Sequence, residues 1–270
     1  MIIVNLHIPK NAGTTLDIIF KNIYGRGFYR FKDIAPGFIS NEEVVRGVLS
    51  QQKYSFFSGH SLCLYENLDV SYITFLRSPE KRIVSLYKYE KKNGSALANS
   101  LNFNDWIIER SKTDTALSNF QYRQIMNLYN KPINFNESDI DKIIEKFYFI
   151  GIVEQFDKSL IHFSHLINKD KEELGYLIAN KSKSEEVIPS KKSKKLIEEL
   201  NSIDYLLYDK AVKRLDSINI YDKELVDFKK FNINYKGSFG DFKIKYIYFI
   251  KENLKRIPYL LKLKRILFKR

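Results

Sequence analysis

Short apolar runs alternate with longer amphipathic stretches along most of this chain. The runs are rich in Ile, Val and aromatic residues, and their lengths are typical of buried strands. They lie at residues 1–6, 53–60, 70–76 and 147–153. Because such runs carry no polar face, we expect strands whose two faces are both covered, as in a parallel sheet.

The stretches between the runs have the periodicity of helices. After the first run, Leu16, Ile19, Phe20 and Ile23 recur at helical spacing, and the pattern ends near Gly25. Similar patterns predict a helix over 80–92, mainly helical structure over 103–128 and a helix from about 157. Strands that alternate with helices indicate an α/β protein. We therefore predict a P-loop-like three-layer sandwich with a mostly parallel central sheet.

Four polar residues directly follow the predicted strands. They are Lys10, His60, Arg77 and Glu154. Ligands of parallel sheets bind at the carboxyl ends of the strands, so we expect these side chains to share one site.

The loop "HIPKNAGTTL", residues 7–16, joins the first strand to its helix. Unpaired N–H groups at a helix start, together with Lys10, suit a phosphate or sulfate. A Walker A loop would instead place its Lys after the second Gly. The strand over 70–76 also ends in Arg77, where a nucleotide triphosphatase would need a metal-binding Asp. These features favour an anionic nucleotide that Lys and Arg bind without a metal.

Composition and charge narrow the class of protein further. The chain has 270 residues, a net charge of +13, a sequence pI of about 9.4 and a single cysteine, Cys63. We expect a cytosolic protein, because the first apolar run is too short for a signal peptide or a membrane span. The high charge indicates anionic partners, whether nucleotides, lipids or other polyanions.

The last part of the chain differs from the rest. We predict a domain over 1–215 and a basic C-terminal extension over 216–270. In the extension, Ile250, Leu254, Ile257 and Leu261 share one helical face, and Pro258 predicts a kink. A basic amphipathic helix of this kind is typical of docking on the anionic inner face of the cytoplasmic membrane.

Several motifs together carry a resemblance to a known family. "HIPKNAGTTL" resembles the phosphosulfate-binding loop of carbohydrate sulfotransferases related to heparan sulfate 2-O-sulfotransferase. "TFLRSPEKRIVSLYKY", residues 74–89, resembles the motif that binds the 3′-phosphate of the sulfate donor PAPS, 3′-phosphoadenosine 5′-phosphosulfate. "SGH", "NFQYRQIMNL", "FIGIVEQFDKSL" and, more weakly, "LNSIDYLLYDKA" follow in family order over residues 1–215.

The resemblance implies a PAPS-dependent O-sulfotransferase with a carbohydrate acceptor, 3′,5′-ADP as product and no metal. His60 would be the general base, and Lys10 would act on the leaving oxygen. The implied donor-binding residues are Lys10, Asn11, Ala12, Gly13, Thr14 and Thr15 for the phosphosulfate, Arg77 and Ser85 for the 3′-phosphate, and Lys181 and Lys183 as a cover. Gln121, Arg123 and Gln124 would line the acceptor site or the donor pocket.

Other interpretations of the same residues stay open. The chain could be a kinase-like transferase, or a basic module that binds a membrane or nucleic acid without activity; the pattern of the extension favours lipid over nucleic acid. His7 fits a structural role better than a catalytic one, and Cys63 fits an inert core thiol. Glu154 could either orient neighbouring groups or act directly. His162 and His165 lack a third ligand that would make a metal site.

Overall fold

The computed structural model describes residues 1–31, 40–112, 115–129, 131–177 and 186–235. Five strands form one sheet in the order β2-β3-β1-β4-β5, and every neighbouring pair is parallel. They are β1 (Ile3–Leu6), β2 (Phe28–Arg30), β3 (Phe56–Gly59), β4 (Ser71–Leu76) and β5 (Phe147–Ile152). β1 lies in the middle of the sheet, and the order in which later strands are added runs in opposite directions on its two sides. Ligands of such sheets bind at this switch point.

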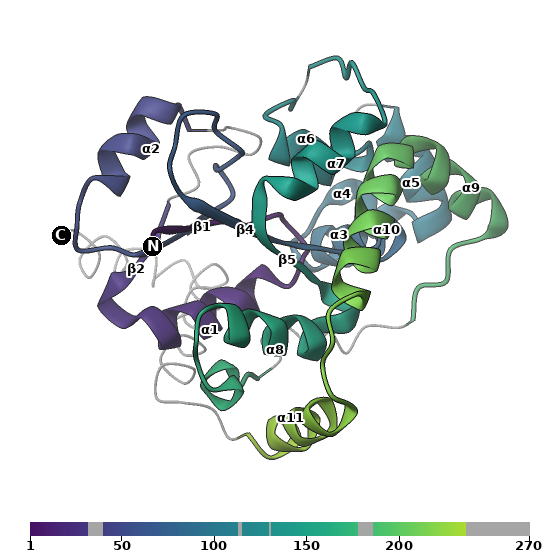
Figure 1. The fold of residues 1–270 in the computed structure, drawn as a ribbon. Coiled ribbons are helices and arrows are strands. Elements are labelled where there is room, and N and C mark those ends of the chain that lie inside the picture. The colour runs from purple at the N-terminus through teal and green to yellow at the C-terminus, as the bar shows by residue number, and fades with distance from the viewer. Residues whose placement is uncertain (32–39, 113–114, 130, 178–185, 236–270) are drawn as a thin grey trace, which may run out of the picture.

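Helices cover both faces of the sheet, as Figure 1 shows. Successive residues of a strand point to opposite faces, so Ile3 packs in one core and Val4 in the other. The first core includes α1 (Gly13–Tyr24), α8 (Phe156–Leu166) and, outside α8, α11 (Asp222–Asn234). The second includes α2 (Glu42–Leu49), α6 (Phe120–Ile125), α7 (Ser138–Glu145) and α10 (Ser202–Asp216). The predicted three-layer fold is confirmed.

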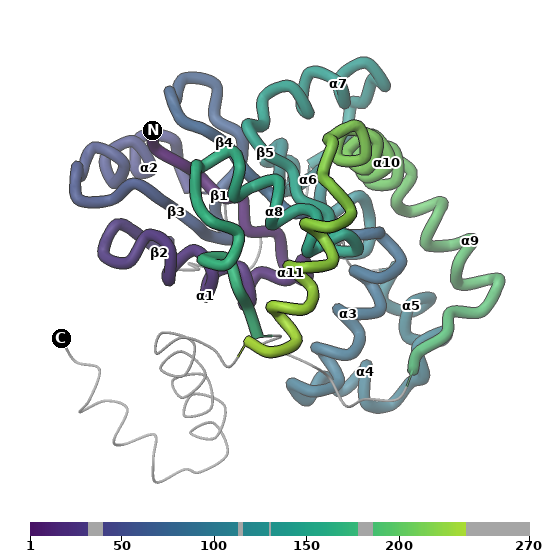
Figure 2. The backbone as a smooth tube through the Cα atoms, turned by 60° about the horizontal axis from the view of Figure 1, so that its bottom comes forward, coloured from purple at the N-terminus to yellow at the C-terminus, as the bar shows by residue number. Residues whose placement is uncertain are grey.

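A third apolar cluster lies beside the sheet, where the chain leaves the carboxyl end of β4 (Figure 2). Its centre is the fully buried Trp106, which packs against Ile83 and Tyr87. The helices of this cluster are α3 (Pro79–Lys92), α4 (Ala96–Ser100), α5 (Phe103–Ser111) and α9 (Lys191–Leu200). Short 3-10 turns complete the described elements: η1 (Gly25–Gly27), η2 (Thr115–Leu117), η3 (Val153–Gln155) and η4 (Lys171–Leu174).

The sequence patterns located the central strands well but missed the short edge strand and several helices. The elements not predicted are β2, α2, α4, α7, α9, α10 and α11, and the helical region over 103–128 is divided into α5, η2 and α6. The domain boundary at residue 215 stays a prediction, although α11, beyond it, packs against α8. Most of the predicted basic extension, residues 236–270, lies outside the described residues. Within the described ranges, none of the helices combines the length and the apolar character needed to span a membrane.

Candidate active site

The loop between β1 and α1 has the backbone shape of an anion-binding site. Lys10 and Ala12 both have positive φ, 73° and 59°, a conformation that costs a non-glycine residue free energy. When residues with positive φ alternate with other residues, successive backbone N–H groups point toward one side of the loop. Among the described residues, the N–H groups of Ala12, Gly13 and Thr14 have no hydrogen-bond acceptor. The loop therefore presents three donors at the positive end of α1.

Not every predicted donor of this loop faces a ligand. The N–H of Asn11 donates to the carbonyl of Ile8 at 3.3 Å, and the N–H of Thr15 donates to Ala12 at 3.0 Å. These two N–H groups already have backbone acceptors. They therefore stabilise the turn and do not face a ligand. The prediction that all amides from Asn11 to Thr15 hold the anion is therefore too broad.

The buried Asn11 side chain joins the loop to the rest of the sheet. Its Nδ2 donates to the carbonyl of Phe75 in β4 and to Oε1 of Gln121, both at 2.7 Å. Asn11 was predicted to help hold the phosphosulfate, but both hydrogens of its amide are used inside the protein. Its side chain fixes the loop against β4 instead.

Lys10 and Arg77 meet at the carboxyl ends of β1 and β4. The Arg77 Nη1 donates to the Lys10 carbonyl oxygen at 2.9 Å. The Lys10 Nζ lies 4.0 Å from the centroid of the Tyr89 ring on α3, a cation–π contact. Burial, and then the charges of Arg77 and other cations, lower the pKa of Lys10 from 10.5 to about 8. The predicted pair of cations therefore lies at one site, which favours an anionic ligand.

Glu154 orients this cationic group. Its Oε2 accepts from the N–H of Ser78, at the start of α3, at 3.3 Å and from the Tyr208 hydroxyl at 3.1 Å. Its Oε1 lies 3.9 Å from the Arg77 Nε and 4.0 Å from the Lys81 Nζ. Of the two roles left open for Glu154, the orienting role agrees with these contacts.

Gln121 and Gln124 are buried and hold strand ends in place. Oε1 of Gln121 accepts from the Arg77 N–H at 3.0 Å, and its Nε2 donates to the Arg77 carbonyl at 2.9 Å. Nε2 of Gln124 donates to the carbonyls of His7 at 3.2 Å and His60 at 3.0 Å. Both residues lie at the predicted site, but they position other residues, because their amides bind backbone groups.

Arg123 binds backbone carbonyls of neighbouring loops. Its guanidinium donates to the carbonyls of Ser118, Leu128 and Lys131, which belong to the loops on either side of α6. These contacts favour a role in holding the loops over the predicted contact with a substrate.

Three residues that position α6 were not predicted from the sequence. The fully buried Asp204 accepts from the N–H groups of Gln121 at 3.0 Å and Tyr122 at 2.8 Å. Oδ1 of Asn201 accepts from the Asn119 N–H, and Oδ1 of Asn119 accepts from the N–H groups of Ile203 and Asp204. The only sequence signal for them was the pair of motifs "NFQYRQ" and "LNSIDY".

His60 lies at the carboxyl end of β3, beside His7. The two rings make an edge-to-face contact, with centroids 4.3 Å apart. Burial, followed by the charges of His7, Arg30 and Lys10, lowers the pKa of His60 from 6.5 to about 2. His60 is therefore uncharged at neutral pH, and without a bound ligand it is a weak base.

The remaining predicted residues occupy different environments. Ser85 is half-buried on α3, two turns beyond Arg77. Lys181 and Lys183 lie outside the described residues. Burial raises the pKa of the Cys63 thiol to about 11, which agrees with an inert thiol. In the described part of the chain, no group of three or more His, Cys, Asp and Glu side chains could hold a metal.

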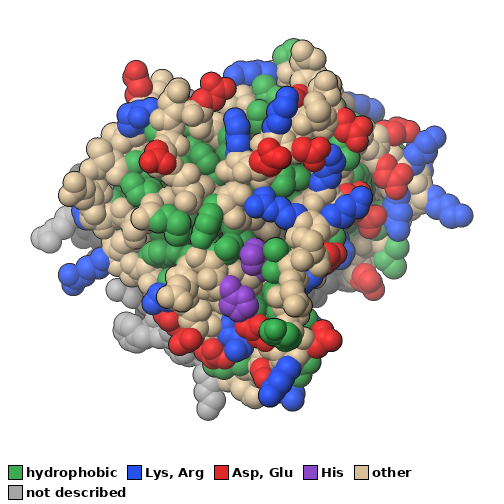
Figure 3. All heavy atoms as spheres, in the orientation of Figure 1, with side chains coloured by type: hydrophobic (Ala, Val, Ile, Leu, Met, Phe, Trp, Pro, Cys, Tyr) green, Lys and Arg blue, Asp and Glu red, His purple; other side chains and the backbone are tan. Residues whose placement is uncertain are grey.

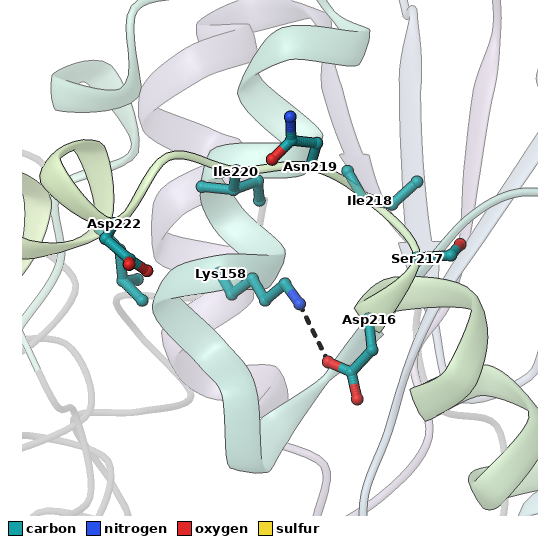
Figure 4. A pocket seen from close by; sticks show the side chains of 8 residues that line it. Lys158, Asp216, Ser217, Ile218, Asn219, Ile220 and Asp222 are labelled. Atoms are coloured by element: carbon teal, nitrogen blue, oxygen red, sulfur yellow. Dashed lines mark hydrogen bonds and ion pairs between the residues drawn. The ribbon is translucent and has the colours of Figure 1, made fainter.

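A separate hollow of about 410 Å³ lies between α8 and the chain that joins α10 to α11 (Figure 4). The Lys158 Nζ and an Asp216 carboxylate oxygen form an ion pair there at 2.9 Å. None of the predicted site residues lines this hollow.

A parallel α/β sandwich with free amides, a lysine and an arginine at its central strand ends is the arrangement expected of a class of proteins that bind an anionic group there. The sequence matches the Sulfotransferase family over residues 2–229. The chain therefore belongs to this family, whose proteins transfer sulfuryl groups. A protein of Archaeoglobus fulgidus, described only as uncharacterized, is 25% identical over 188 residues, which are 63% of this chain and 74% of that protein.

Proposed function

We propose that the protein transfers a sulfuryl group from PAPS to a hydroxyl group of a carbohydrate. The contact between Arg77 and Lys10, next to the free amides of α1, carries the proposal for the donor. This contact places two cationic residues, from the ends of two strands, at the start of a helix. PAPS carries negative charge at both its 5′ and its 3′ groups, so it is a suitable ligand for such a place. The proposal for a carbohydrate acceptor rests on the motifs that resemble carbohydrate sulfotransferases.

The residues have complementary roles in the proposed reaction. The acceptor oxygen attacks sulfur while the bond between sulfur and the 5′-phosphate oxygen breaks, and 3′,5′-ADP leaves. His60 takes the proton of the acceptor hydroxyl, and the charge of Lys10 stabilises the leaving oxygen. Burial is the main cause of the low pKa of His60, and the negative charge of the bound donor offsets only the smaller contribution of the nearby cations. No step of this scheme needs a metal.

A thermal-shift experiment tests the nucleotide. We expect 3′,5′-ADP without Mg²⁺ to raise the melting temperature, and ATP with Mg²⁺ to raise it much less. The matched variants are Lys10→Ala and Lys21→Ala, because Lys21 lies at the opposite end of α1. Lys10→Ala should lose the shift and Lys21→Ala should keep it. An equal or larger shift with Mg-ATP would favour the kinase-like alternative.

Turnover tests the base and the acceptor. Radiolabelled PAPS, incubated with glycans of the source organism, should yield a labelled carbohydrate. His60→Ala should keep 3′,5′-ADP binding but reduce this rate by about 10²–10⁴. Unchanged turnover would remove His60 from the role of base, and label in a protein or lipid fraction alone would contradict a carbohydrate acceptor.

The basic extension carries a further proposal, docking on the inner face of the cytoplasmic membrane. Residues 236–270 contain eleven Lys and Arg against two Asp and Glu. On the face in Figure 3, by contrast, basic and acidic side chains are mixed. The full chain should float with liposomes that contain an anionic lipid, and a chain ending at residue 235 should not. Equal flotation of both would contradict this proposal.

A further inference from the structure

Tyr89 lies on α3 one turn beyond Ser85, so the two side chains share one face of the helix. Tyr89 is 52% exposed and belongs to none of the three apolar clusters. Within the described ranges its hydroxyl makes no hydrogen bond. Core packing therefore does not explain this aromatic residue.

Tyr87, two residues earlier, has the opposite environment. It is 3% exposed, its ring packs against Trp106, and its hydroxyl donates to the Leu101 carbonyl at 2.9 Å. Tyr87 thus has a structural role on α3. The exposed ring of Tyr89 needs another explanation.

That ring lies at the anion-binding loop. The Lys10 Nζ is 4.0 Å from its centroid, within the range of about 6 Å for a cation–π contact. The Lys10 side chain thus extends from the loop to α3. The His7 ring fills another side of the same loop, where a Cβ added to Gly13 would overlap it. An anion must therefore approach the loop from a side other than that of His7.

Lys10 needs a partner that holds its charge in place. Its four-carbon side chain is flexible. Burial, followed by the charges of Arg77, Lys92 and Arg82, lowers its pKa. In the described part of the chain, no carboxylate or carbonyl oxygen accepts a hydrogen bond from the Lys10 Nζ.

An aromatic ring suits this task better than a carboxylate. The negative face of the ring attracts the ammonium, but the ring carries no net charge that would neutralise it. An ammonium has three N–H groups, and those that do not face the ring stay available to a ligand. A carboxylate at the same place would pair with Lys10, and an anionic ligand would have to displace it.

We propose that Tyr89 is a positioning residue, whose ring holds the Lys10 ammonium in the site without neutralising it and so keeps its charge available to the 5′-phosphosulfate of the donor. The inference rests on the proposed function, because it explains how the cation that binds the donor is held. The contact between the ring and Lys10 can be tested without the donor.

A titration of Lys10 tests this contact. NMR of protein with ¹³C-labelled lysine side chains measures the pKa of Lys10, and Lys10→Met assigns its signal. Tyr89→Phe keeps the ring and should leave this pKa at about 8. Pentafluorophenylalanine in place of Tyr89 keeps the shape of the ring but removes its negative face, so the pKa should be about half a unit lower than in Tyr89→Phe. Equal pKa values in these two variants would overturn the inference.

Tyr89→Glu tests why the partner is a ring. The new carboxylate should raise the pKa of Lys10 and compete with the ligand, so that the affinity for 3′,5′-ADP falls about 10-fold or more. Tyr221→Glu places the same charge on another exposed tyrosine, just before α11, and should keep the affinity of the wild type. An unchanged affinity in Tyr89→Glu, or a fall without the rise in pKa, would overturn the inference.

Melting temperatures show that each variant folds. A wild-type protein that binds neither PAPS nor 3′,5′-ADP would contradict the proposed function itself. The titration of Lys10 would still decide whether the Tyr89 ring holds its charge.

Discussion

Two regions at the carboxyl edge of the sheet handle charge in opposite ways. Around Lys10 and Arg77, positive charges lie close together, and Glu154 is the carboxylate that approaches Arg77 among the described residues. Around His7, each charge has a compensating partner, because Arg30 pairs with Asp17. Positive side chains without a carboxylate partner bind an anion strongly but add little to folding stability. Side chains in a network of paired charges instead hold one another in fixed positions. We infer that binding and precision are divided between the two halves of one site.

The largest effect should come from the cationic half. Lys10→Ala should reduce sulfuryl transfer by about 10³-fold, as expected for the loss of a group that stabilises the leaving oxygen. Its melting temperature without ligand should not fall, because the change removes a partly buried cation from other cations. Activity and unfolding measured on one preparation check both parts, and a large loss of stability would contradict the proposed division.

The compensated half should behave in the reverse way. Asp17→Asn removes the charge that balances Arg30, and breaking a largely buried pair costs about 3 kcal/mol of unfolding free energy. Denaturant unfolding measures this loss. Glu42→Gln, which breaks the more exposed ion pair between Arg46 and Glu42, is the control and should cost less than about 1 kcal/mol. Equal costs would show that the network around His7 contributes no more than a surface pair.

The lowered pKa of Lys10 predicts proton uptake when the donor binds. With a pKa of about 8, most Lys10 side chains are neutral at pH 8.5, and a bound anion restores their charge. Binding of 3′,5′-ADP at pH 8.5 should then take up about 0.7 proton, by linkage. Calorimetry in buffers of different ionisation enthalpy measures this number, and Lys10→Met should abolish it.

The same pKa sets a pH dependence of stability. The folded pKa of Lys10 is lower than that of the unfolded chain, so between about pH 8 and 10.5 the unfolded state binds more protons. The contribution of Lys10 to stability therefore increases as pH rises through this window. The difference between the unfolding free energies of wild type and Lys10→Met, followed from pH 7 to 10.5, should show that rise.

The smallest effect should follow from Glu154→Gln. The amide keeps an oxygen for the Ser78 N–H and the Tyr208 hydroxyl but removes a negative charge near Arg77. Affinity for 3′,5′-ADP should rise several-fold, because less attraction within the protein competes with the ligand. A fall in affinity would show instead that the carboxylate is needed to orient Arg77.

The sequence alone predicts where the strands end, but it does not predict the side-chain contacts between those ends. Lys10, His60 and Arg77 could be placed because each follows a strongly apolar run, whose end marks the edge of the sheet. The β2 strand has only three residues, all partly exposed, so its pattern was too short to reveal Arg30. Without Arg30, its pair with Asp17 could not be inferred either.

Side-chain direction on α6 was also beyond the sequence. Gln121 and Arg123 are two residues apart on one short helix, so they point to different sides. Which side faces the site depends on Asn119, Asn201 and Asp204, whose contacts join segments more than 80 residues apart. A motif indicates that such residues matter, but it does not say which of them turns inward.

The overlap between Gly13 and the His7 ring has a consequence for protein engineering. Any side chain at position 13 would need the space that the imidazole fills, so the two positions can be redesigned only as a pair. A library that varies position 13 alone should return glycine, whereas one that also admits small residues at position 7 can recover alanine or serine there.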